Sequence, residues 1–155
     1  MSSDTGSVTR ADEGHAPEAT PLPASHSDRG DELELWPFPS AVPCARPHAA
    51  AVLAEWGLTR WIDDAALVVS ELVTNAVAAA EAMVDTEPIL LRLFVIRGRL
   101  VVEAWDANPA FPEPRTPDED EDSGRGLIIV QALSEACGVD VSADGRKVVW
   151  ARLRL

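Results

Sequence analysis

The sequence contains no apolar run that approaches about 18 residues, and no short apolar segment of the secretory type near its start. A helix that crosses a membrane needs about 20 mainly apolar residues. We therefore expect neither a membrane span nor a signal peptide, and the default is a soluble protein of the reducing cytoplasm. Cysteine is also scarce: Cys44 and Cys137 lie far apart and form neither a disulfide framework nor a metal-binding spacing.

Basic residues are few as well. The chain has 13 lysines and arginines against 26 acidic residues, which gives a net charge of −13. Such a charge repels nucleic acids and anionic membranes, so neither is expected as a partner. A single nucleotide is not excluded, because Mg²⁺ and backbone dipoles can offset the field at one site. The length of 155 residues and hydrophobic fraction of 46% suit one domain with tails.

Residues 1–31 are rich in Ser, Asp, Glu, Pro, Thr, Gly and Ala and show no periodicity. Such a segment buries too little surface to offset its ordering entropy, so it is predicted to be a disordered tail. Residues 32–155 form the predicted domain. Its expected elements are a strand that begins near Leu33, helices over 41–56, 63–82 and 124–137, and strands over 89–97, 100–106, 139–142 and 147–155.

Two hairpins and one long loop connect these elements. Gly98-Arg99 predicts a tight turn with Gly at its first position, and Asp144-Gly145 predicts a second one. Residues 108–123 contain four prolines and the acidic run 118–122, which makes them too polar for a packed element. Loops of this length in compact domains are usually either functional lids or disordered segments.

The helix predicted over 63–82 carries two polar residues on one face. Glu71 and Asn75 are four residues apart, so they lie one turn apart among apolar residues. A carboxamide oxygen is a suitable ligand for Mg²⁺, and a carboxylate beside it could polarise a water or a hydroxyl. The polar edge of an ordinary amphipathic helix explains the same pattern, so both interpretations stay open at this point.

Asp106 ends an apolar strand on the face that it shares with Val102 and Ala104. A carboxylate there can accept a hydrogen bond from an exocyclic amine, such as the 6-amino group of adenine. Guanine has a carbonyl at that position, so the contact would distinguish the two bases. A carboxylate that only caps the turn toward Asn108 fits the sequence equally well.

Gly124-Arg125-Gly126 opens the third predicted helix directly after the acidic run. The first N–H groups of a helix have no internal partner and suit phosphate oxygens, while Arg125 could add a charge-assisted contact. The pattern is neither a Walker loop nor a dinucleotide fingerprint, because no GK[ST] is present and position 129 is not glycine. A flexible hinge before the helix is the alternative.

The order and spacing of these motifs resemble the histidine-kinase-like ATPase fold of gyrase and the histidine kinases. Within it they are most similar to small bacterial ATP-binding proteins of the anti-sigma-factor serine/threonine kinase type. The matching segments are 71–77, 105–109, 124–127 and 145–151, and the similarity runs from about residue 33 to the C-terminus. The resemblance implies an α+β fold: a two-layer α/β sandwich with a mixed, mainly antiparallel sheet covered on one face by about three helices.

The resemblance also implies a role for each matched residue. Glu71 would be the general base, Asn75 the Mg²⁺ ligand, and Asp106 the carboxylate that recognises adenine. Residues 108–123 would form a lid over ATP. The other candidates for contact with the nucleotide are Asn108, Gly124, Arg125, Gly126 and Leu127.

The leading functional hypothesis is an ATP-dependent serine/threonine kinase that binds a sigma factor and phosphorylates an antagonist protein, with a homodimer as one assembly that the resemblance allows. The alternative is a catalytically inactive module, with ATP or without a nucleotide, that sequesters a protein partner. The alanines at 78–80 and the valines at 148–149 favour this alternative, because members of the family that the chain resembles usually carry polar side chains there. Chance motif matches in an unrelated α/β protein would instead predict no affinity for ATP.

Overall fold

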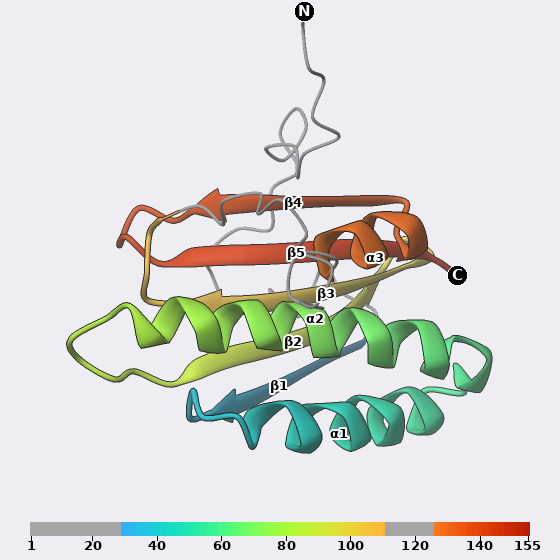
Figure 1. The fold of residues 1–155 in the computed structure, drawn as a ribbon. Coiled ribbons are helices and arrows are strands. Elements are labelled where there is room, and N and C mark those ends of the chain that lie inside the picture. The colour runs from blue at the N-terminus through green and yellow to red at the C-terminus, as the bar shows by residue number, and fades with distance from the viewer. Residues whose placement is uncertain (1–28, 111–125) are drawn as a thin grey trace, which may run out of the picture.

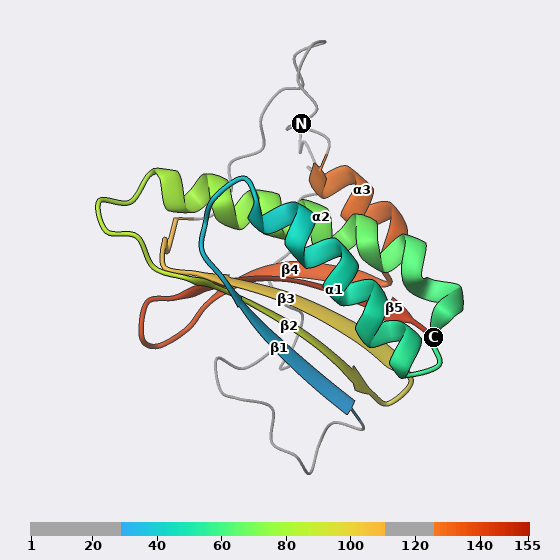
Figure 2. The same cartoon turned by 90° about the horizontal axis from the view of Figure 1, so that it is seen from below.

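The computed structural model describes residues 29–110 and 126–155. Five strands form one antiparallel sheet in the order β1-β2-β3-β5-β4. Three helices cover one face of this sheet (Figures 1 and 2). The elements are β1 Arg29–Leu35, α1 Ala41–Glu55, a 3₁₀ turn Thr59–Trp61, α2 Ile62–Glu81, β2 Ile89–Ile96, β3 Arg99–Asp106, α3 Gly126–Leu133, β4 Ala136–Val141 and β5 Lys147–Arg154.

This architecture confirms the predicted α+β sandwich, with one refinement. Every strand pair in the described residues is antiparallel, so the sheet is not mixed. Within the same residues, no helix has the length and apolar character needed to cross a membrane.

The main core lies between the helices and the sheet. Helix α2 is central, because its apolar residues recur at the helical period and face the strands. Burying each large aliphatic side chain contributes about 1.5–3 kcal/mol relative to its exposure. The residues from α2 and from the strands that form this core include Val68, Leu72, Val73, Ala76, Leu91, Leu93, Val102, Ala104, Val149 and Ala151.

Strand β1 begins earlier than the sequence indicates. The composition of residues 29–31 predicts that they belong to the tail, but they pair with β2, where Arg29 lies opposite Val95. Strand pairing uses backbone groups and does not require apolar side chains. The polar side chains also find partners: Asp31 Oδ2 lies 2.5 Å from His48 Nε2 on α1. The rest of the predicted tail, residues 1–28, lies outside the described residues.

The third helix is shorter than predicted. It ends at Leu133, and residues 136–138 belong to strand β4 rather than to the helix predicted over 124–137. The reason is long-range pairing: Glu135 donates its backbone N–H to Arg152 O at 2.8 Å, and Ala136 then pairs with Arg152. Gly138 therefore lies within a strand and does not end a helix.

The predicted hairpin between β2 and β3 is present, but its turn is shifted by one residue. Ile96 pairs with Arg99, so the turn residues are Arg97 and Gly98 rather than Gly98 and Arg99. Both have positive φ, 51° and 71°, as a type I′ turn requires. The second hairpin is confirmed, with Gly145 at φ 86° between β4 and β5.

Candidate functional site

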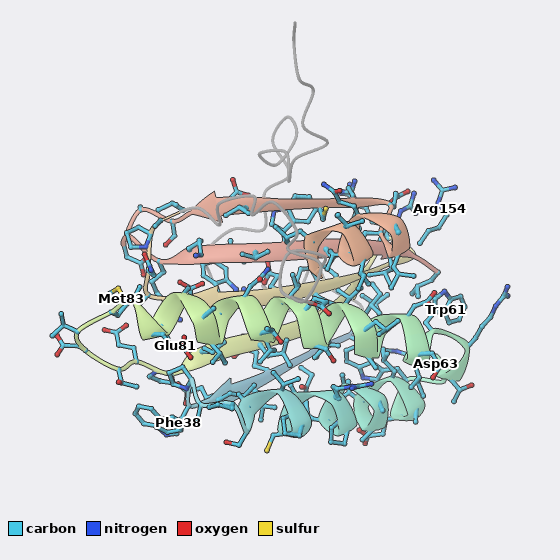
Figure 3. The ribbon with its side chains drawn as sticks, in the orientation of Figure 1. Phe38, Trp61, Asp63, Glu81, Met83 and Arg154 are labelled. Carbon is cyan, nitrogen blue, oxygen red and sulfur yellow. The ribbon has the colours of Figure 1, made fainter. Side chains whose placement is uncertain are left out.

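Helix α2 carries two of the predicted site residues along one line. The helix crosses the sheet from Asp63, near its start, to Glu81, its last residue (Figure 3). Glu71, Asn75 and Ala79 follow one another at four-residue intervals, so they form a row about 12 Å long. All three are half-buried, whereas the residues that face the sheet are fully buried. The row is therefore open to contacts from other elements.

The start of α3 lies against Glu71 at one end of this row. Gly126 is buried, and a Cβ atom placed on it would lie 3.2 Å from Cδ of Glu71 and closer still to Oε2. Any larger residue at this position would displace the carboxylate. The first backbone N–H groups of α3 have no partners within their own helix and carry the positive end of its dipole. The contact therefore places the Glu71 carboxylate beside a helix terminus that is suited to anions.

Asn75 occupies the middle of the row. Its Nδ2 atom is buried and has no hydrogen-bond partner among the described residues. Leaving such a group unsatisfied costs about 1–3 kcal/mol, so a ligand or a water is expected here. A half-turn about χ2 exchanges the amide nitrogen and oxygen. The side chain can therefore offer an N–H to an anion or an oxygen to a cation.

Asp106 lies at the end of β3, and only 2% of this residue is exposed. Its two oxygens differ. Oδ1 accepts the backbone N–H of Asn108 at 2.8 Å, whereas Oδ2 is buried and has no hydrogen-bond partner in the described residues. Burial raises the pKa of Asp106, and the ammonium of Lys147 opposes that change. Asp106 is thus a fixed carboxylate with one oxygen left for a donor.

Asn108 joins the turn after β3 to helix α2. Its Nδ2 donates to the carbonyl of Ala79 at 3.0 Å, and its Oδ1 accepts the backbone N–H of Ala110 at 3.0 Å. Ala79 is in the last turn of α2, where carbonyls lack their full intrahelical partners. Both ends of the Asn108 side chain are thus engaged, and the residue positions Asp106 relative to the row on α2.

Lys147 lies beside Asp106, although the sequence motifs do not mark it as a candidate. It begins β5 directly opposite Asp106, is 3% exposed, and places Nζ 3.5 Å from Asp106 Oδ2. Its Nζ also donates to the carbonyl of Ala110 at 2.8 Å. One signal could have found it: strand alternation puts Lys147 on the same side as Val149 and Ala151, where a charge needs a partner.

A family model for the histidine kinase-like ATPase domain matches residues 35–153, which include every residue of the candidate site. The chain belongs to this family. The predicted family membership is thereby confirmed. A comparison with curated proteins gives no significant match.

Among solved structures, this histidine kinase-like ATPase domain is similar to the crystal structure of the RsbU and RsbW domains of Rv1364c from Mycobacterium tuberculosis. The TM-score is 0.59 and the sequence identity 19%. The match covers 82% of this chain and 32% of the other, so this chain spans about a third of that protein. At this identity the likeness shows the fold alone.

The described residues of this ATPase domain fit a nucleotide with Mg²⁺. Asn75, in the row, and Asp106, beyond one end of it, each have a buried polar atom without a hydrogen-bond partner among the described residues. At the other end, Gly126 has no side chain of its own and the Glu71 carboxylate lies against it. Asn75 and Glu71 carry oxygen atoms of the kind that Mg²⁺ prefers as ligands. Among the described residues no group of three or more Asp, Glu, His or Cys could hold a metal alone, so Mg²⁺ would need ligands from phosphates or water as well.

The other predicted site residues are placed only in part. Leu127 follows Gly126 in α3 and is half-buried. Gly124, Arg125 and most of the predicted lid, residues 111–123, lie outside the described residues.

Proposed function

We propose that this domain binds ATP with Mg²⁺ and transfers the γ-phosphoryl group to a serine or threonine of a protein, as an anti-sigma-factor kinase does. The observation that carries the proposal is the row Glu71–Asn75–Ala79. Its two ends meet Gly126 of α3 and the Asp106–Asn108 turn, so a carboxamide lies between an anion-binding helix terminus and a carboxylate that can accept an amine.

The proposed contacts with the base and the phosphates follow from the unsatisfied groups. Asp106 Oδ2 accepts a hydrogen bond from the 6-amino group of adenine and so gains the partner that it lacks among the described residues. The backbone N–H groups at the start of α3 bind phosphate oxygens, because a helix N-terminus favours anions. Gly126 adds no side chain of its own there, beside the Glu71 carboxylate. Asn75 turns its oxygen toward the cation. Mg²⁺, when bound, would neutralise charge on the phosphates.

Glu71 is the proposed general base. Its carboxylate lies beside the first residue of α3, next to the place proposed for the phosphates. From there it accepts the proton of the attacking serine or threonine hydroxyl, which then forms a bond to the γ-phosphorus as the bond to ADP breaks. The chain thus supplies position and charge, which is most of what phosphoryl transfer requires.

The proposed partners are a sigma factor, which is bound, and an antagonist protein, which is phosphorylated. The net charge of −13 suits partners that present a basic face. We place the protein in the cytoplasm, with a homodimer as its proposed assembly.

Calorimetric titration with ATP, with and without Mg²⁺, tests the nucleotide site. We expect a dissociation constant well below about 1 mM, a binding free energy beyond roughly −4 kcal/mol. Mg²⁺ should tighten binding, and Asp106→Asn should weaken it by at least about tenfold, or about 1.4 kcal/mol. Asp85→Asn, which removes the same charge from an exposed loop position, should leave it unchanged. A folded chain that shows no heat of binding would contradict the proposal.

Transfer of ³²P from γ-labelled ATP to soluble proteins of the same cell tests the kinase step. Glu71→Ala should abolish labelling of serine and threonine while ATP still binds, and Glu81→Ala, an exposed glutamate on the same helix, should have no effect. The alternative function, sequestration of a partner without catalysis, is favoured by the three alanines at 78–80, which add no polar group beside the row. It predicts no labelling with either the unaltered chain or the variants.

A further inference from the structure

Lys147 is a lysine on the core-facing side of a strand, where a charge is costly unless it is paired. Only 3% of the residue is exposed, and strand pairing places it directly opposite Asp106. Its Nζ lies 3.5 Å from Asp106 Oδ2 and donates to Ala110 O at 2.8 Å. The ammonium is therefore held between the end of β3 and the turn that follows it.

Asp106 is an acceptor alone only while it is ionised. A carboxylate only accepts hydrogen bonds, whereas a protonated carboxyl can also donate one. In this position burial raises the pKa of Asp106, and the opposing influences are Lys147 first, then the backbone N–H of Asn108, with Arg146 the weakest. Both cations come from the start of β5. On α2, the group that contacts this turn is the uncharged carbonyl of Ala79. Asn75, one helical turn before it, is also uncharged, and the charged residue of the row, Glu71, is two turns away.

The ionisation state of Asp106 determines whether it can discriminate between bases: the ionised group offers only acceptors, whereas the protonated group offers a donor as well. An acceptor at this position pairs with the exocyclic amine of adenine. A donor would pair with the carbonyl that guanine and hypoxanthine carry at the same ring position. The Asp106 Oδ2 atom has no other hydrogen-bond partner among the described residues, so its protonation state is not fixed by a second contact there.

We propose that Lys147 is a specificity-determining residue of the nucleotide site: it holds Asp106 as a hydrogen-bond acceptor and so selects a purine with an amine at position 6 over one with a carbonyl. This inference rests on the proposed function. Lys147 acts through Asp106 and need not touch the base, so it is a positioning residue.

The test compares Lys147→Met, which keeps the length of the side chain and removes its charge, with Lys147→Arg, which keeps the charge. Binding of ATP, GTP and ITP is measured by calorimetry between pH 6 and pH 9. The unaltered chain should prefer ATP by at least about tenfold throughout. Lys147→Met should lose about tenfold in ATP affinity at pH 7 and regain it as the pH rises, because Asp106 then ionises without help. Lys147→Arg should retain most of the preference.

Arg146→Met serves as the matched control, because it removes the neighbouring charge whose influence on Asp106 is the weakest. It should change the pH profile much less than Lys147→Met does. A Lys147→Met variant that binds ATP as the unaltered chain does, or that is weaker by the same factor at every pH, would overturn the inference. The uniform loss would indicate a purely structural role.

A second measurement needs no nucleotide. Titration of the Asp106 carboxyl carbon by ¹³C NMR should give a higher pKa in Lys147→Met than in the unaltered chain. If the unaltered chain does not bind ATP, the proposed function fails, and this titration still decides whether Lys147 controls the charge of Asp106. If ATP binds but neither base preference nor titration changes in the variant, the inference alone fails.

Discussion

Strand β3 carries two buried carboxylates, Glu103 and Asp106, on opposite faces of the sheet. Glu103 is 0% exposed and Asp106 is 2% exposed, and each faces a cation from a neighbouring strand. Glu103 Oε1 lies 3.2 Å from Arg92 of β2, and Asp106 Oδ2 lies 3.5 Å from Lys147 of β5. Burial raises the pKa of both acids. The same local chemistry thus occurs twice on one strand.

The two carboxylates differ in what surrounds them. Glu103 lies in the middle of its strand, accepts the indole N–H of Trp105 at 3.3 Å, and shares Arg92 with Glu32 of β1. Asp106 lies at the strand end, where the turn, α2 and the start of β5 meet. Each has one oxygen without a hydrogen-bond partner in the described residues, so such an oxygen does not by itself mark a site. The position of Asp106 at a strand end, next to a loop, is what distinguishes it as the candidate site residue.

The largest loss of stability should come from breaking the ion pair between Glu103 and Arg92, for which no ligand is proposed. Glu103→Ala leaves the buried Arg92 without its closest carboxylate, and loss of one partner from a buried ion pair typically destabilises by about 3–5 kcal/mol. We expect a loss near the lower limit, about 3 kcal/mol, because Arg92 keeps its contact with Glu32. Urea denaturation measures the loss. ATP affinity of the folded variant should stay within about twofold, or about 0.4 kcal/mol; a greater change would mean that the two carboxylates are not separate in function.

The second-largest effect is on the pH dependence of the free energy of unfolding. The pKa of Glu103 is raised from 4.5 to about 7, chiefly by burial. Because the folded chain binds this proton more tightly than the unfolded chain, Glu103 contributes stability that is complete below pH 4.5 and lost as the pH rises through about 7. The difference corresponds to roughly 3 kcal/mol at most. Glu103→Gln should remove this decline in urea denaturation between pH 5 and pH 8; an unchanged slope would exclude Glu103 as its source.

The smallest loss of stability is expected from replacing Glu135, an exposed carboxylate that can be compared with the two buried ones. Its carboxylate contacts Arg99, Arg152 and Arg154, and hydrogen bonds from Arg99 and then Arg154 lower its pKa to about 2. This contribution to stability is present above pH 4.5 and lost as the pH falls toward 2. Glu135→Gln should destabilise less than Glu103→Ala at pH 7, and 0.5 M salt should shrink its effect. An effect as large as that of Glu103→Ala would refute the ranking by burial.

Features that depend on neighbouring residues in the sequence were predictable. The apolar period of α2 placed Glu71 and Asn75 on one face, and Asp144-Gly145 located the last hairpin. The segment 136–138 was misassigned because its strand pairing with β5 is a long-range contact that outweighs its local helical pattern. The position of the turn at Arg97 is not predictable for a related reason. The pairing of β2 with β3 places this non-glycine residue in the turn, where it adopts a positive φ.

In the candidate site, too, the contacts between distant residues could not be predicted from the sequence. The sequence indicates Glu71, Asn75 and Asp106 as candidates because each is a polar residue in the apolar pattern of its own helix or strand. Lys147 does not stand out in this way, because its contact with Asp106 depends on the register between the neighbouring strands β3 and β5. Alternation along β5 would have identified a lysine on an apolar face, but it would not have named the partner. The contact between Gly126 and Glu71 likewise depends on how two helices pack.

The hydrogen bond from Asn108 to the carbonyl of Ala79 limits which insertions the chain can tolerate during evolution. This bond fixes one end of the site to α2 at position 79. The other end contacts α2 at Glu71, about two turns earlier, so the helix sets the distance between the two ends. One residue inserted between positions 71 and 79 would rotate one end by about 100° relative to the other. Insertions should therefore be excluded from this part of the helix, and variation in length between relatives should be confined to the loops.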